Sequence, residues 1–189
     1  MSNEPVNLRK EEAEKLLINA ARSVLLEGNL HPTTKLISDT AGVNPSSITR
    51  HFGGLQGLLI ETTHSLLEEF ATSLGSNPTL ARVEDPLFVT RTKIVALLLQ
   101  QGVDPTLFLP RRETITEGFI SNQTSISNVS EKTAIAFWQL AALSTEGFTI
   151  FGETHPFNEQ QKQDTFALVL KIREMLPQIE KELSWDSLN

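Results

Sequence analysis

The chain has 189 residues, of which 39% are hydrophobic and 21% are charged, so it can bury a substantial core and is neither disordered nor fibrous. It contains no cysteine, which excludes disulfides, thiolate zinc sites and cysteine nucleophiles. The net charge of −7 disfavours indiscriminate nucleic-acid binding, because lysine and arginine supply phosphate affinity by displacing counterions.

The amino-terminal stretch MSNEPVNLRKEEAEK lacks the apolar segment of a signal peptide. The longest aliphatic run, residues 95–99, is too short to cross a bilayer. We therefore expect a soluble, cytoplasmic protein with no membrane partner.

The first predicted helix lies within residues 8–29. Its apolar residues recur at spacings of three and four and so share one face: Leu17, Ala20, Ala21, Val24 and Leu25. Gly28 is a natural stop for this helix. The second predicted helix spans Thr34–Ala41, because the Thr33 hydroxyl can cap its free amides and Gly42 ends it.

A third, short helix is predicted to start at Asn44 and Pro45, which combine a capping side chain with the residue best suited to the first helical position. Ile48 and Phe52 are four residues apart, so they share the face that points into the protein. Ser46, Thr49 and Arg50 should then point outward. After two glycines, residues 58–74 have the pattern of a longer amphipathic helix.

The second half of the chain carries most of the bulky apolar volume, with eight of the ten phenylalanines and both tryptophans beyond residue 80. The predicted helices there are 86–101, 106–121 with a bend at Pro110, 131–151, and 158–175 closed by Pro177. Asn158 and Gln161 stand at the spacing of a capping box. No stretch has the alternation of a strand, so the sequence predicts an all-α fold.

Two short helices joined by a glycine-containing turn, with longer helices on either side, are the arrangement of a helix-turn-helix DNA reader. Residues 28–59 resemble the N-terminal domain of the TetR family of transcriptional regulators without a gap. The matching positions are Gly28, Thr33, Ile37, Ala41, Gly42, Val43, Phe52 and Leu58. The resemblance implies a DNA-binding domain over residues 1–55, a connecting helix over 56–75, and a larger helical effector-binding and dimerisation domain over 76–189.

The chain departs from the family pattern at three positions. Thr49 stands where the family usually has a tyrosine, and Leu55 stands where a lysine usually opens the fourth helix. Both family residues commonly touch phosphate, so their loss bears on DNA affinity more than on the fold. Backbone amides at the start of the fourth helix remain available to phosphate. Ser38 replaces the usual alanine.

A recognition helix presents small polar residues with one or two long donors that read base edges. We expect Arg50 to contact a guanine, with a phosphate contact and a surface ion pair as the alternatives. For His51, contact with the DNA and packing at the helix edge are both open. The predicted DNA-binding residues are Thr33, Lys35, Asn44, Ser46, Ser47, Thr49, Arg50 and His51.

Aromatic residues at helical spacing in the second half are first of all core candidates. If a pocket exists there, a few polar groups among them would orient a mostly apolar ligand. The candidate lining residues are Phe88, Gln100, Phe108, Arg112, Thr116, Phe119, Trp138, Gln139 and Thr145. The resemblance implies a small-molecule effector and a homodimer formed through the last two long helices.

The function predicted from these features is a homodimeric repressor that binds a palindromic operator in double-stranded DNA and is released by a small-molecule effector. The alternative is a helical ligand-binding or protein-binding module of the same fold with little DNA affinity. The four histidines have no metal-binding spacing, and no catalytic constellation is present in the sequence. We therefore expect no enzyme activity, no metal and no cofactor.

Overall fold

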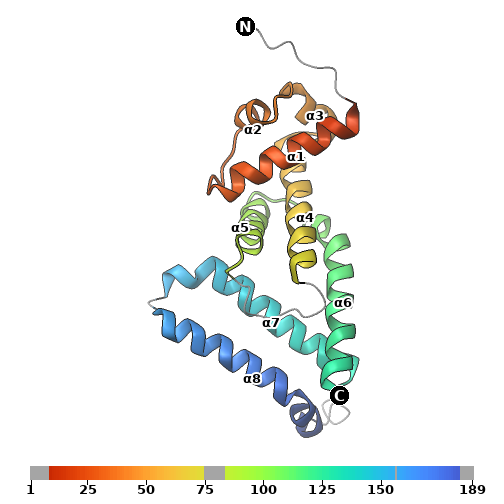
Figure 1. Cartoon of the computed structure of the whole chain (residues 1–189), viewed down its shortest axis with the longest axis vertical. Helices are drawn as coiled ribbons and strands as arrows, with labels where there is room; N and C mark the ends of the chain where they lie inside the picture. Colours follow the sequence, from red (N-terminus) through yellow and green to blue (C-terminus); the bar gives the residue numbers. More distant parts are fainter. Residues whose placement is uncertain (1–8, 75–83, 156, 184–189) are drawn as a thin grey trace. The chain divides into compact units, whose positions relative to one another are not determined.

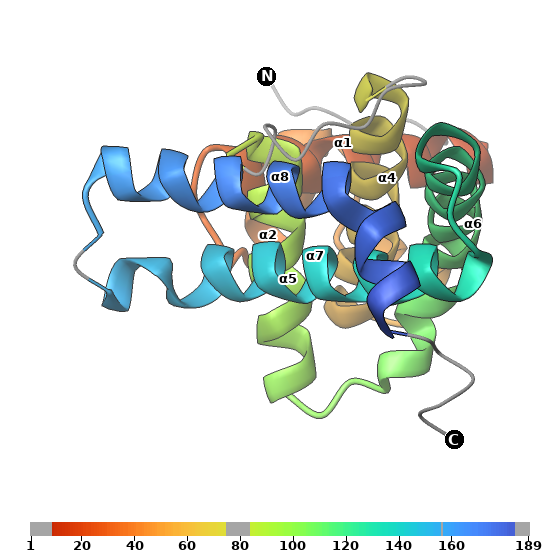
Figure 2. The same ribbon diagram turned by 90° about the horizontal axis from the view of Figure 1, so that it is seen from below.

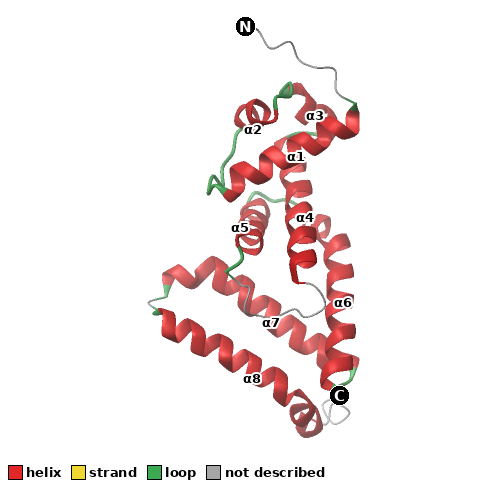
Figure 3. Cartoon of the chain, in the orientation of Figure 1, coloured by secondary structure: helices red, strands yellow, loops and turns green. Residues whose placement is uncertain are grey.

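The computed structural model of the chain describes residues 9–74, 84–155 and 157–183, together with their side chains except those of residues 110–115. All regular structure in these ranges is helical, and Figure 3 draws helices and loops there, which confirms the predicted all-α class. The described residues fall into two compact units. Unit 1 holds residues 9–73 and 85–111, and unit 2 holds residues 74, 84 and those from 112 onward.

Unit 1 opens with four helices that match the predicted order (Figure 1). They are α1 (Lys10–Leu26), α2 (Thr34–Ala41), α3 (Ser46–Phe52) and α4 (Leu55–Leu74). The fourth begins at Leu55 rather than at the predicted residue 58, since the glycine turn that ends α3 is only two residues long.

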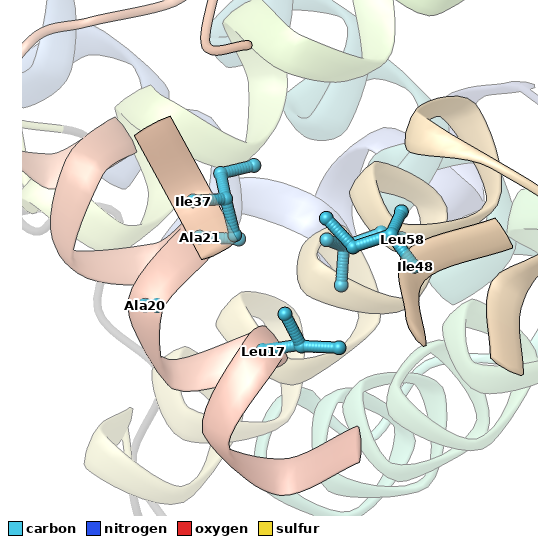
Figure 4. Close-up of a cluster of buried hydrophobic side chains, with 6 residues drawn as sticks. All are labelled: Leu17, Ala20, Ala21, Ile37, Ile48 and Leu58. Atoms are coloured by element: carbon cyan, nitrogen blue, oxygen red, sulfur yellow. The ribbon is translucent and has the colours of Figure 1, made fainter. Parts of the chain in front are cut away.

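The side chains that hold these helices together come from all four of them (Figure 4). Leu17 of α1, Ile37 of α2, Ile48 of α3 and Leu58 of α4 are each 0% exposed. Ala20 and Ala21 complete the cluster, and Phe52 packs against it while remaining partly exposed. The predicted inward face of α3, Ile48 with Phe52, is therefore confirmed.

The polar ends of the short helices are capped as the sequence predicts. Thr33 Oγ1 accepts a hydrogen bond from the amide of Leu36 at 3.1 Å. Asn44 Oδ1 accepts from the amide of Ser46 at 2.9 Å, and Pro45 already has a helical backbone with φ −53°. Gly42 ends α2 at φ +64°, a left-handed conformation that residues with a Cβ rarely adopt. These local interactions mark the ends of both helices.

A close approach of two backbones joins α3 to α4. A Cβ added at Gly57, in the first turn of α4, would overlap the carbonyl oxygen of Phe52. Only glycine allows the two helices to meet at this distance. The sequence suggested no role for Gly57. The constraint comes from the backbone of Phe52 at the end of α3, and no periodic pattern in the sequence records that contact.

Unit 1 also contains α5 (Pro86–Gln100) and the 3₁₀-helix η2 (Pro105–Phe108). Leu25 and Leu59 form a second buried cluster with Ile94, Leu98 and Phe108. Residues 85–111 therefore pack with the N-terminal helices, although they lie beyond the predicted connecting segment. The functional division into 1–55, 56–75 and 76–189 stays a prediction.

Unit 2 contains α6 (Leu109–Ser127, which begins at the end of unit 1), α7 (Glu131–Phe151), the 3₁₀-helix η3 (Gly152–Thr154) and α8 (Glu159–Leu183). The predicted bend at Pro110 is wrong, since Pro110 is the second residue of α6, where the missing N–H has no partner to lose. The predicted capping box is confirmed: Asn158 and Gln161 exchange side-chain to amide hydrogen bonds, both 2.9 Å long.

The predicted end of the last helix at Pro177 is also wrong, because α8 continues to Leu183. Contacts on both sides of the proline offset its lost hydrogen bond. Leu176 is buried in the cluster of unit 2. Glu180 accepts from the Ser130 amide at 3.0 Å and from the Thr133 hydroxyl at 2.6 Å. The hydroxyls of Ser130 and Thr133 lower the pKa of Glu180. Figure 2 shows α8 running beside α7 and turning in its last part.

Ser38 provides a stability test. Its side chain is 1% exposed, and its hydroxyl has no hydrogen-bond partner in the described structure. Ser38→Ala should raise the free energy of unfolding by about 1 kcal/mol, because an unpaired buried hydroxyl is removed. Ser130→Ala is the control and should lower it by about 1 kcal/mol, since Ser130 caps α7. Urea unfolding followed by circular dichroism measures both, and a loss of stability in Ser38→Ala would contradict the assignment.

Gly57 provides a second test. Gly57→Ala should destabilise the protein by about 1 to 3 kcal/mol, because α3 or α4 must shift to relieve the overlap with Phe52. Gly118→Ala in α6 makes the same change where a Cβ meets nothing within 4 Å, and it should be neutral or stabilising. Equal melting temperatures for the two variants would show that the close approach is not required.

Candidate nucleic-acid interface

The outer face of α3 carries small polar side chains and one arginine. Ser46, Thr49 and Arg50 are exposed, and they lie opposite the buried Ile48. Spacings of three and four residues place them on one side of the helix. With so little bulk on this side, the backbone of α3 can come close to the edges of base pairs in a major groove.

Arg50 is the longest donor on this face. Its Nη2 atom lies 3.4 Å from the Ser47 hydroxyl and 3.2 Å from His51 Nε2. Within the described residues no carboxylate pairs with its guanidinium, so the ion pair considered as an alternative for Arg50 is not formed. The guanidinium keeps its charge and most of its N–H donors available for an external partner.

Two of the predicted contact residues are not on the outer face. Ser47 is only 4% exposed, which does not favour a contact with DNA, and its role stays a prediction. His51, four residues later on the same side of α3, has a side chain that is 6% exposed. Its Nδ1 atom lies 3.6 Å from Glu14 Oε1 of α1, so the ring is packed at the helix edge rather than presented to DNA. Of the two alternatives for His51, the structure shows the packed one, with Glu14 of α1 beside the ring.

Glu14 is a residue for which the sequence suggested no role at the site. The helical pattern of α1 puts it outside the apolar stripe, and its side chain is 28% exposed. Its proximity to His51 arises only when α3 packs across α1. No periodicity in the sequence carries that information.

At the start of α2, two of the predicted DNA-binding side chains already have partners within the protein. Thr33 is exposed, and its hydroxyl caps the helix. Lys35 Nζ lies 2.5 Å from Asp39 Oδ2, with side chains that are 81% and 59% exposed. An exposed pair of this kind contributes little to stability, so Lys35 can exchange Asp39 for a phosphate at small cost.

At the position where the family usually has a lysine, this chain has an apolar residue that packs in unit 1. Leu55 is half-buried and contacts both apolar clusters of unit 1. Thr49 is exposed but short. The first amides of α4 have no partner within their own helix, as at any helix N-terminus, and they remain the donors of this region that suit a phosphate.

The predicted effector-lining residues are not gathered in one unit. Phe88, Gln100 and Phe108 belong to unit 1, where Phe108 is buried and Phe88 packs on Phe70 with ring centroids 5.3 Å apart. The side chain of Arg112 lies outside the described residues.

The other candidates belong to unit 2: Thr116, Phe119, Trp138, Gln139 and Thr145. Phe119 and Trp138 are brought together, with ring centroids 4.4 Å apart. Thr145 is buried, and its hydroxyl donates to the carbonyl of Ala141 at 2.9 Å within α7. Gln139 is exposed.

Comparison with known protein families agrees with this geometry. Residues 17–62, which run from α1 into α4, match the family described as "Bacterial regulatory proteins, tetR family". Over these residues the chain carries the N-terminal domain of TetR-family regulators. It is a DNA-binding transcription regulator whose helix-turn-helix domain includes α2 and α3. Members of the family are regulators rather than enzymes. A comparison with curated proteins finds no match to the chain.

Proposed function

We propose that this TetR-family protein is a repressor that binds a palindromic operator as a homodimer and leaves it when a small molecule binds to the second half of the chain. The observation that carries the proposal is the exposed face of Ser46, Thr49 and Arg50 on a helix anchored by the fully buried Ile48. The proposed site of action is the cytoplasm, where the DNA is.

Base recognition is assigned to Arg50. A guanidinium donates two parallel hydrogen bonds to the N7 and O6 atoms of guanine, which discriminates against other bases by about 1 to 3 kcal/mol. Lys35, Thr49 and the amides at the start of α4 are assigned to phosphates, which position the protein without reading sequence. Asn44 and Thr33 act mainly through the helix ends that they cap.

The dimer is supported by the apolar surface of unit 2. Leu140, Leu143 and Phe151 are 54%, 68% and 60% exposed, and their spacings of three and eight residues place them on one face of α7. By length and composition, Glu131–Thr154 is apolar enough to cross a membrane, yet only 17% of its apolar 18-residue window is buried. A second copy of the chain covers such a surface through α7 and α8, in a two-fold symmetric pair.

A two-fold pair presents two copies of α3 to one face of a duplex. Half-sites of a palindrome are then read about 34 to 36 Å apart, one helical turn of DNA. An effector lowers DNA affinity if it binds more tightly to a form of the dimer in which the two recognition helices are spaced differently. The largest possible decrease is set by the ratio of the effector's affinities for the two forms. The pair of Phe119 and Trp138 in unit 2 offers an apolar surface of the kind that such ligands use.

Substitutions of Arg50 and of Lys35 should impair DNA binding in different ways. Arg50→Ala should reduce discrimination between the preferred duplex and a single-base variant by about 5- to 100-fold, because the base contact is lost. Arg50→Lys keeps the charge without the two parallel donors and should lose most of the same discrimination. Lys35→Ala should weaken binding to every sequence alike and reduce the slope of log K against log salt by about one. Fluorescence anisotropy with duplexes selected from a random pool measures these quantities.

Lys171→Ala is the matched control for Lys35, since Lys171 forms a comparably exposed pair with Glu174 at 2.9 Å in α8. It should leave both affinity and salt slope unchanged. If Arg50→Ala and Lys35→Ala lost affinity equally on all sequences, the division into reading and positioning groups would be wrong.

The apolar face of α7 can be tested by charge. Leu143→Glu should raise the dissociation constant of the dimer at least about tenfold, because two carboxylates enter the symmetric interface without partners. Leu99→Glu changes a leucine of α5 that is 41% exposed, and it should leave the dissociation constant of the dimer unchanged. Sedimentation equilibrium at micromolar concentration reports both. A wild-type mass equal to one chain would contradict the homodimer.

Footprinting on the DNA that flanks the protein's own gene, across a salt series, tests the proposed function as a whole. Two protected half-sites and a steep salt dependence are the expected result. The acidic chain favours one competing function, a ligand-binding or protein-binding module of the same fold. Absence of protection at low salt, together with a retained small molecule, would establish that alternative instead.

A further inference from the structure

We propose that His51 is a positioning residue for Arg50: its neutral ring accepts a hydrogen bond that holds the guanidinium in the orientation for base recognition, and protonation of the ring releases it. The inference rests on the proposed function, in which Arg50 reads a base. It assigns a role in sequence recognition to a side chain that does not itself face the DNA.

The contact between the two side chains determines where the imidazole proton lies. Arg50 Nη2 is 3.2 Å from His51 Nε2. A guanidinium nitrogen can only donate, so Nε2 must be the acceptor and the proton of the neutral ring must lie on Nδ1. The Nδ1 atom is the one that faces Glu14 Oε1, at 3.6 Å. The negative carboxylate favours a proton on the nitrogen beside it and thereby leaves Nε2 free to accept.

His51 is fixed well enough to act as a support. Its side chain is 6% exposed, whereas Arg50 beside it is exposed. The Ser47 hydroxyl, also buried, lies 3.4 Å from the same Nη2 atom of Arg50. A long arginine side chain loses considerable rotamer freedom when it binds, and two buried acceptors at its tip remove part of that freedom in advance.

The charged groups that face the ring come from two helices. Glu14 approaches from α1, with Lys10 Nζ 3.7 Å from the same carboxylate oxygen, and Arg50 approaches from α3. Ile37 of α2 and Leu58 of α4, both apolar, pack with Ile48 on the inner face of α3. Protonation of Nε2 therefore has two opposite effects. The ring gains an ion pair with Glu14, and it can no longer accept a hydrogen bond from the guanidinium of Arg50, which it now repels.

This exchange predicts that base discrimination depends on pH through His51. In the wild type, the ratio of affinities for the preferred duplex and for the variant at the Arg50-dependent base pair should fall at least threefold between about pH 8 and about pH 5, because a protonated ring no longer accepts from Arg50. Each ratio is taken at a single pH, so general effects of pH on DNA binding cancel. A ratio that is constant over this range would overturn the proposal.

His51→Phe keeps a ring of similar size in the packed position and removes both nitrogens. The full-length variant should show a discrimination ratio at about pH 8 that is reduced by about 3- to 10-fold and no longer changes with pH. His155→Phe makes the same change in unit 2 and should behave as the wild type. Circular dichroism melting checks that His51→Phe is folded, and the pH series on the wild type tests the proposal even if it is not.

Arg50→Ala separates failure of this inference from failure of the proposed function. If Arg50→Ala loses discrimination while His51→Phe and the pH series do not, Arg50 reads the base and His51 does not position it. If Arg50→Ala retains discrimination, or if the wild type selects no sequence, the assigned base contact fails and the role of His51 fails with it.

Discussion

The burial of Ile48 is the constraint on which the rest of the site depends. A short helix of seven residues has little stability of its own, so α3 forms and holds its rotation because Ile48 is 0% exposed among Leu17, Ile37 and Leu58. Full burial of such a side chain contributes about 1.5 to 3 kcal/mol. With that side chain fixed, helical geometry places Arg50 on the opposite face and His51 on the flank beside α1.

The site works with few charges in an acidic protein. Leu55 contributes packing between two clusters where a cation is usual in the family, which leaves Lys35 as the lysine assigned to phosphate. Affinity for phosphate is then modest, and recognition depends more on how well one guanidinium is oriented. The contacts of Arg50 with Ser47 and His51 provide that orientation, because they restrict the side chain before DNA arrives.

Local signals in the sequence predicted the capped ends of α2 and α3, the inward face of α3 and the capping box of α8, since each depends on residues within four positions of one another. The burial of Ser47 and the proximity of Glu14 to His51 were not predicted, because Glu14 and His51 lie on different helices, α1 and α3. The passage of α8 through Pro177 depends on Glu180 reaching the start of α7, and the inclusion of α5 in unit 1 depends on Ile94 and Leu98 packing against Leu25 and Leu59. Contacts between segments far apart in the chain leave no periodic signal.

Methylation interference at guanine N7 tests the central claim most directly, because Arg50 is assigned to that atom. On a duplex selected by the wild type, the account predicts that methylation of one guanine in each half-site blocks binding, and that this interference disappears for Arg50→Ala while other positions keep theirs. If no guanine interferes, or if the pattern is the same for Arg50→Ala, α3 does not meet the groove in the pose that the burial of Ile48 imposes.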